Sequence, residues 1–174
     1  VLLIMIVLFK GTNSSKFVNN LMVAVKIIVI LLFVLVGMFY VTPTNWTDNF
    51  APQGMSGIMI GATTVFFAYL GFDTISTSAE ETLNPQKALP RAIIITLLIC
   101  TVFYIIVCLV ITGMVPFSQL GKGDALAYVL GVVGQDKIAG IVSLGAVIGL
   151  LSGPLGTMFA AVRVLYTMSR DGLL

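Results

Sequence analysis

The sequence contains no histidine, and charged residues make up only 9% of its 174 positions. Without histidine the chain lacks the side chain that proteins use most often as a proton shuttle and metal ligand. Ordinary globular domains have roughly 25% charged residues, so this composition argues against a water-soluble domain. The net charge of +2 and the scattered basic residues provide no basic patch for nucleic acid.

Cysteine is also scarce. The only two, Cys100 and Cys108, lie in one apolar run, about 12 Å apart along a helix, which is too far for a disulfide. We interpret both as packing residues. The chain has no Ser/His/Asp set and no Gly-x-Gly-x-x-Gly phosphate loop. We therefore expect neither an enzyme nor a bound cofactor or metal.

Apolar residues dominate instead, at 59% of the chain with a mean hydropathy of +1.11. A helix needs roughly 20 apolar residues to cross a bilayer. The pattern predicts an all-α polytopic membrane protein with an incomplete span and four full spans, at residues 1–9, 18–40, 55–78, 92–115 and 138–166. The connector 116–137 contains a short apolar stretch, "ALAYVLGVV", predicted to be a small helix at the interface or over a vestibule. Because Val1 lies inside an apolar run, we expect a fragment of a longer protein.

Basic residues set the predicted orientation. Connectors alternate between the two sides, and six of the nine basic residues fall on one side: Lys10, Lys16, Lys87, Arg91, Arg163 and Arg170. Only Lys122 and Lys137 fall on the other side. The positive-inside rule therefore places the larger group in the cytoplasm.

Two ionisable residues, Lys26 and Asp73, lie inside predicted spans. A charge at the bilayer centre costs about 2.5–3.5 kcal/mol on insertion scales, so both should face protein or a water-filled cavity. Alternatively, Lys26 extends to the headgroups and Asp73 lies near the interface. Lys26 is about 13 Å of helical rise from the start of its span, which favours a functional burial.

The segment "GATTVFFAYLGFDTISTS" places Gly71 between an aromatic half and a Ser/Thr-rich half. Such a glycine suggests an unwound turn, which lipid tolerates only where the freed backbone groups line a cavity or meet a ligand. A continuous helix that contains glycine is the alternative. In the last span, Gly145, Gly149 and Gly153 recur every fourth residue and predict a close helix–helix contact.

The stretch "FFAYLGFDTISTSAEETLNPQKALPRAI" resembles the sixth helix of amino acid–polyamine–organocation permeases, and most closely their cationic amino acid transporter branch. "RVLYTMSRDGLL" is similar to the end of helix eight in that branch. The resemblance implies the end of helix four through helix eight of a transporter built from two five-helix inverted repeats, with the sixth helix broken at the midplane. It also implies a location in the plasma membrane.

The resemblance implies a substrate site at the break. The carbonyls of Phe67, Ala68 and Leu70 would accept hydrogen bonds from a substrate ammonium, next to Gly71. Phe66 and Tyr69 would shape the pocket. Asp73 would either favour cationic groups or anchor the second half-helix.

In proton-driven members of the family, a lysine on helix five stands where sodium-driven relatives bind a cation. Lys26 matches that context, and an amine in a low-dielectric cavity can release and regain a proton. "SGPLG" departs from the Thr-rich pattern of the branch, which leaves Ser152 as the candidate contact on helix eight. The partners implied are an amino acid, protons, the bilayer and the remaining helices of the permease. An exchanger and a non-transporting sensor on the same fold remain alternatives.

Overall fold

The computed structural model describes residues 12–47, 51–121 and 123–173, and the described part of the chain is helical and contains no strand. This confirms the predicted all-α class. The predicted partial span 1–9, together with Lys10 and Lys122, lies outside the described residues. Four described segments are long and apolar enough to cross a membrane: Phe17–Met38, Gly54–Ala79, Pro85–Met114 and Asp136–Arg170.

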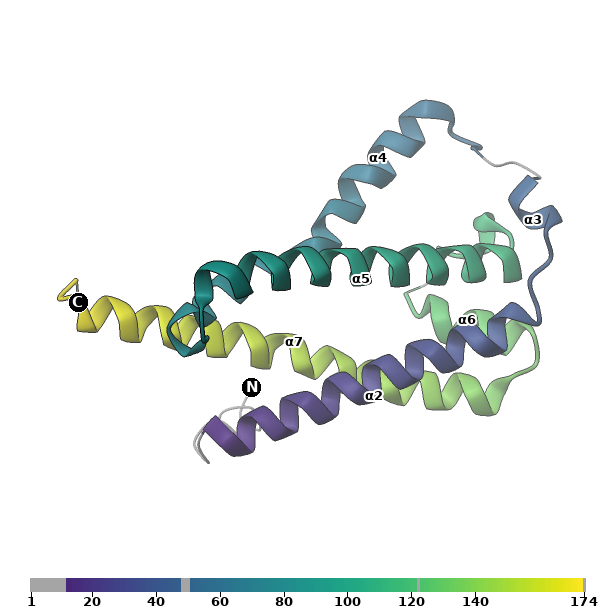
Figure 1. Ribbon diagram of the computed structural model, residues 1–174. Coiled ribbons are helices and arrows are strands. Elements are labelled where there is room, and N and C mark those ends of the chain that lie inside the picture. Colours follow the sequence, from purple (N-terminus) through teal and green to yellow (C-terminus); the bar gives the residue numbers. More distant parts are fainter. Residues whose placement is uncertain (1–11, 48–50, 122, 174) are drawn as a thin grey trace.

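The long helices are α2 (Thr12–Met38), α4 (Gly54–Phe66), α5 (Pro85–Met114) and α7 (Asp136–Arg170). α2 packs against α7 and α5, whereas α4 diverges from the other long helices (Figure 1). None of the residues of α4 is buried in this chain. α5, at 30 residues, and α7, at 35 residues, exceed the roughly 20 residues that cross a bilayer, so they extend beyond the hydrocarbon core or tilt within it.

Proline explains why the helix α5 begins at residue 85, before the predicted membrane span 92–115. Asn84 has a left-handed backbone and precedes Pro85, which occupies the first turn, where the missing N–H would have no partner in any case. The helix then continues through Pro90, at the loss of one backbone hydrogen bond. α7 likewise continues through Pro154.

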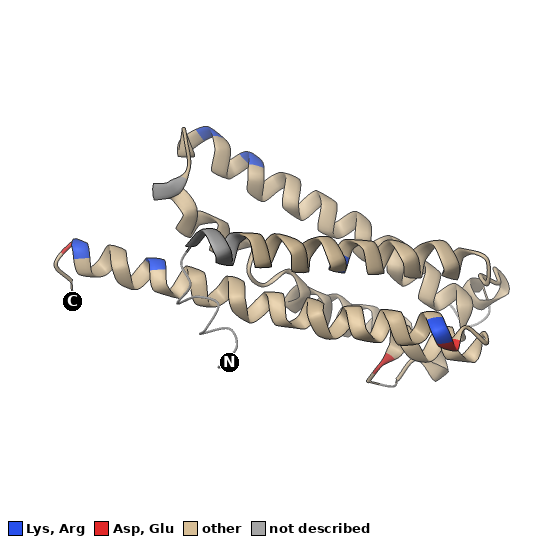
Figure 2. Cartoon of the chain, turned by 90° about the horizontal axis from the view of Figure 1, so that it is seen from below, with Lys and Arg blue, Asp and Glu red and all other residues tan. Residues whose placement is uncertain are grey.

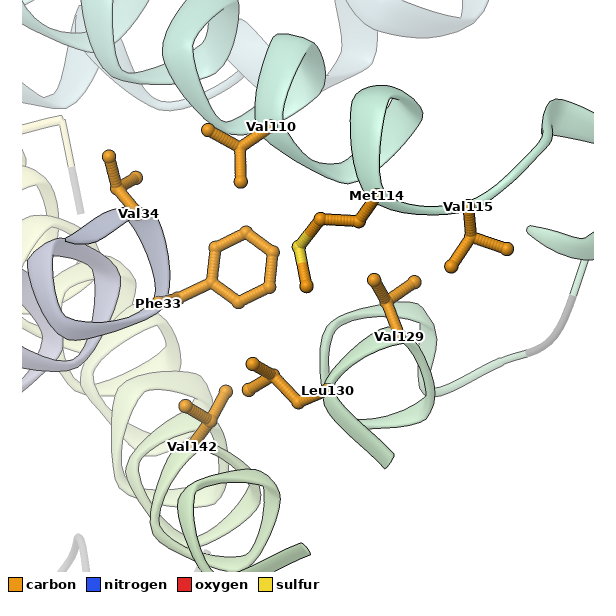
Figure 3. Close-up of a cluster of buried hydrophobic side chains, with 8 residues drawn as sticks. All are labelled: Phe33, Val34, Val110, Met114, Val115, Val129, Leu130 and Val142. Carbon is orange, nitrogen blue, oxygen red and sulfur yellow. The ribbon is translucent and has the colours of Figure 1, made fainter. Parts of the chain in front are cut away.

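The buried apolar core joins helices that are distant in sequence (Figure 3). Phe33 of α2 is 1% exposed, and Val129 and Leu130 of α6 (Ala125–Val132) are each 0% exposed. The remaining members are Val34, Val110, Met114, Val115 and Val142. The short apolar helix of the last connector therefore packs into the bundle, because both of its central side chains are buried there.

Four of the five basic residues of α5 and α7 lie at one end of the bundle (Figure 2). These are Lys87 and Arg91 near the start of α5 and Arg163 and Arg170 near the end of α7. α2 begins at this end, and Lys137 lies near the start of α7 at the opposite end. Among the described residues, Lys87, Arg91, Arg163 and Arg170 thus lie at the end opposite Lys137, as the sequence predicts.

Candidate functional site

The predicted break is present between two half-helices. α4 ends at Phe66 and is followed by a 3₁₀ turn, η1 (Phe67–Tyr69). Leu70 has an extended ψ of 133°, and Gly71 has φ 109° and ψ −7°. A second half-helix of 3₁₀ geometry, η2 (Phe72–Glu81), then packs against α5 and α7. The left-handed φ of Gly71 explains the glycine, because other residues are strained there.

The carbonyls at the break differ in how they are satisfied. The Phe67 carbonyl accepts a hydrogen bond from the Leu70 N–H at 3.2 Å. The Ala68 carbonyl accepts one from the hydroxyl of Tyr104 on α5 at 2.8 Å. Among the described residues, nothing donates to the Leu70 carbonyl. Of the three carbonyls expected at the substrate site, that of Leu70 is therefore the most available.

The apolar side chains at the break are largely exposed in this chain. Phe66, Phe67 and Leu70 are 67%, 65% and 68% exposed, and the two phenylalanine rings meet edge to face with centroids 6.4 Å apart. Tyr69 is half-buried. The break therefore presents three large apolar side chains next to a backbone acceptor, a combination suited to a ligand with both apolar and cationic parts.

Asp73 lies in the first turn of η2, where the helix dipole favours a negative charge. Its side chain is exposed and has no hydrogen-bond or ion-pair partner among the described residues. The described residues therefore contain no side-chain hydrogen bond through which Asp73 could anchor the second half-helix. The position leaves the carboxylate accessible to a cationic group.

Lys26 and Ser152, which are 126 residues apart in sequence, meet where α2 crosses α7. The Lys26 amine donates to the Ser152 hydroxyl oxygen at 2.9 Å. The single Ser152 hydroxyl proton is donated to the Gly149 carbonyl at 2.7 Å, so the serine oxygen faces the amine as an acceptor. Ser152 is 7% exposed, the only buried polar residue among those described. No described carboxylate forms an ion pair with Lys26.

Glycines create the space for this contact. A Cβ on Gly149 would lie 3.0 Å from the Lys26 Cε, and one on Gly145 would collide with Val29. Gly153, the third member of the predicted ridge, has no described atom within 4 Å of its Cβ position. Within the described chain the close contact therefore involves Gly145 and Gly149 but not Gly153, because a spacing of four rotates by about 40° per step on a helix of 3.6 residues per turn. Ser152, three residues after Gly149, returns to the contact face.

Two residues at the break were not predicted from sequence. Thr101 and Tyr104 of α5 both reach the break: the Tyr69 hydroxyl lies 2.9 Å from Thr101 Oγ1, and Tyr104 bonds Ala68 as described above. Their spacing of three places them on one helix face. Two hydroxyl residues at that spacing within the apolar run 92–115 were the available signal.

The described chain also has a cavity of about 470 Å³ between the starts of α3 (Thr44–Thr47) and α4 and the end of α5. Its lining includes Trp46, Gln53, Leu109 and Phe117, and it includes neither Lys26 nor a residue of the break.

Within the described ranges, no three cysteine or acidic side chains are close enough to hold a metal ion. The polar groups of the candidate site are backbone carbonyls, the Lys26 amine, the Asp73 carboxylate and hydroxyl groups.

Comparison with known proteins identifies relatives of the whole chain. The amino acid permease family model matches residues 1–174. The chain is 50% identical over its full length to the methylthioribose transporter of Bacillus subtilis (strain 168), of which it covers 38%. It is 45% identical, over 99% of its length, to the branched-chain amino acid permease BcaP of the same bacterium, of which it covers 37%. It is 42% identical, also over 99% of its length, to the chloroplastic cationic amino acid transporter 9 of Arabidopsis thaliana, of which it covers 30%.

The chain thus spans less than two fifths of the length of these relatives. Each relative is named as a transporter or permease, and the apolar helices make this chain a membrane protein. The resemblance found in the sequence motifs is confirmed: the chain belongs to the amino acid permease family.

Proposed function

We propose that the chain is part of a longer permease that carries an amino acid across the plasma membrane by alternating access, coupled to proton entry. Family membership and the names of the branched-chain and cationic relatives support the amino acid substrate. Transport also suits the absence of a catalytic residue set in the sequence.

The substrate occupies the break. Its ammonium binds backbone carbonyls, with that of Leu70 as the main acceptor and those of Phe67 and Ala68 as additional ones. Phe66 and Tyr69 contact the side chain of the amino acid, and Gly71 allows the backbone to approach it. Asp73 favours substrates with a cationic side chain.

The contact between Lys26 and Ser152 is the observation that carries the proton-coupling proposal. The amine lies between two helices with a hydroxyl acceptor at 2.9 Å and without a paired carboxylate in the described residues. A permanently charged structural lysine within a membrane would be expected to have such a partner. In this proposal the amine carries the coupled proton as the permease opens to each side of the membrane, and its bond to Ser152 links that event to the α2–α7 contact.

Lys26→Met tests this proposal in the full-length permease reconstituted into proteoliposomes. Methionine keeps an apolar chain of similar length but cannot titrate. We expect an inward proton gradient to stop driving accumulation of labelled L-leucine and L-arginine, while binding and exchange remain measurable. Lys26→Arg should fail equally, because guanidinium keeps its proton.

Lys137→Met is the matched control, because Lys137 is exposed at the start of α7, outside the contact between Lys26 and Ser152. The Lys137→Met variant should accumulate substrate normally. Wild-type accumulation by Lys26→Met would make Lys26 a structural charge. If the wild type also exchanges labelled amino acid across the membrane without responding to the proton gradient, the protein is an exchanger. Saturable binding without flux would support a sensor.

Methylthioribose transport is a second candidate, because the relative named for it is 50% identical to this chain. Methylthioribose is a sugar derivative and has no amino group. Accumulation of labelled methylthioribose that excess amino acids do not inhibit would therefore favour this function and count against an ammonium site at the break.

A further inference from the structure

Two side chains of α5 contact the broken segment from the same side. The Tyr104 hydroxyl donates to the Ala68 carbonyl at 2.8 Å, and Thr101 Oγ1 lies 2.9 Å from the Tyr69 hydroxyl. The rings of Tyr69 and Tyr104 meet edge to face, with centroids 5.3 Å apart and planes at 82°. The two hydrogen bonds and the ring contact thus form one connected group, which we call the hydroxyl clasp: Ala68, Tyr69, Thr101 and Tyr104.

Counting protons fixes the direction of each bond. The Thr101 hydroxyl donates its only proton to the Leu97 carbonyl at 2.7 Å, so the Tyr69 hydroxyl must be the donor to Thr101. The Tyr104 hydroxyl donates to Ala68. Each hydroxyl proton in the clasp therefore has an acceptor, and Thr101 acts as an acceptor anchored to its own helix.

We propose that Thr101 and Tyr104 are positioning residues that keep the helix broken when no substrate is bound and decide which carbonyl the substrate meets. An unpaired carbonyl within a membrane is unfavourable, and Tyr104 satisfies the one at Ala68. The Leu70 carbonyl, which has no donor among the described residues, is left for the ligand. The part of this inference that concerns the ligand rests on the proposed function, and the part that concerns the break does not.

Tyr104→Phe and Thr101→Val remove one hydroxyl each and keep the shape of the side chain. Hydrogen exchange of the peptide 66–74 in the substrate-free, full-length permease should become about five- to tenfold faster in either variant, as expected for one lost hydrogen bond. Thr101→Ser, which keeps the hydroxyl, should exchange at the wild-type rate. The effects of Tyr69→Phe and Thr101→Val should not add, because both remove the same bond.

Matched controls use the same chemistry elsewhere. Thr112→Val, also on α5, removes a hydroxyl that bonds only carbonyls of its own helix, and Tyr166→Phe removes one from an exposed ring on α7. Neither should change exchange at 66–74. Wild-type exchange in both Tyr104→Phe and Thr101→Val would overturn the clasp.

Transport kinetics test the role of the clasp in binding. In the clasp variants, the KM for labelled L-leucine or L-arginine should rise about five- to tenfold, with little change in the maximal rate and in the unfolding temperature. An unchanged KM together with faster exchange would overturn the role in substrate positioning. If hydrogen exchange at 66–74 is faster in the variants but the wild-type protein carries neither amino acid, the clasp is supported and the proposed substrate is rejected.

Discussion

At the residue scale, the contact of Lys26 with Ser152 depends on Gly149, which has no functional group of its own. Because a Cβ at Gly149 would lie 3.0 Å from Lys26 Cε, Gly149→Ala should push the lysine side chain away from Ser152. Overpacking of this kind costs about 1–3 kcal/mol. We expect proton-driven accumulation by the full-length permease to fall severalfold, with substrate binding retained, as measured in proteoliposomes.

Gly153→Ala is the matched control for that substitution. Gly153 lies four residues further along the same helix, and no described atom lies within 4 Å of its Cβ position, so accumulation should stay at the wild-type level. Equal accumulation by the two alanine variants would show that the packing at Gly149 does not position Lys26.

At the element scale, the broken segment depends on the backbone of Gly71. No atom of the described residues lies within 4 Å of the Cβ position of Gly71, but its φ is +109°. Alanine is therefore unfavourable there for conformational reasons alone, by about 1–2 kcal/mol. Gly71→Ala should lower the unfolding temperature of the full-length permease and weaken substrate binding, both measurable in detergent by thermal unfolding with and without labelled L-leucine.

Gly61→Ala provides the comparison within α4. Gly61 also has open space around its Cβ position and carries no positive φ, so alanine should leave the unfolding temperature unchanged or raise it through its better helix propensity. A Gly71→Ala protein as stable as Gly61→Ala would mean that the break does not require the left-handed residue.

At the scale of the whole molecule, the distribution of basic residues predicts how the chain crosses the membrane. Leu83, which is 91% exposed, lies between η2 and α5 near the end that carries Lys87 and Arg91. Thr47 is exposed at the end of α3. In a background without Cys100 and Cys108, Leu83→Cys should react with a membrane-impermeant thiol reagent only from the cytoplasmic side, and Thr47→Cys only from outside. The reverse labelling pattern would refute the orientation.

The sequence by itself determined the features that depend on local chemistry. Apolar length identified the segments that are long enough to cross a membrane, and Gly71, next to aromatic residues, marked the break. Hydropathy and the conformational freedom of glycine are properties of a short stretch of chain. The motif around that glycine also identified the family. The first residue of α5 could not be predicted from the sequence, because Pro85 and Pro90 are typical of a loop. Only the structure, with Asn84 as the N-cap, shows that both prolines belong to the helix.

Only the tertiary structure decided which of these residues meet. It brought Lys26 within 2.9 Å of Ser152, which the family resemblance had offered only as a candidate contact. It also placed Ser152 rather than Gly153 on the contact face of α7, and it brought Tyr104 to the Ala68 carbonyl. It also buried Val129 and Leu130 of the short connector helix in the core. Each of these contacts depends on the rotation of a helix about its axis and the height at which it crosses its neighbour. Both are set by side-chain packing between helices, which leaves no local pattern in the sequence.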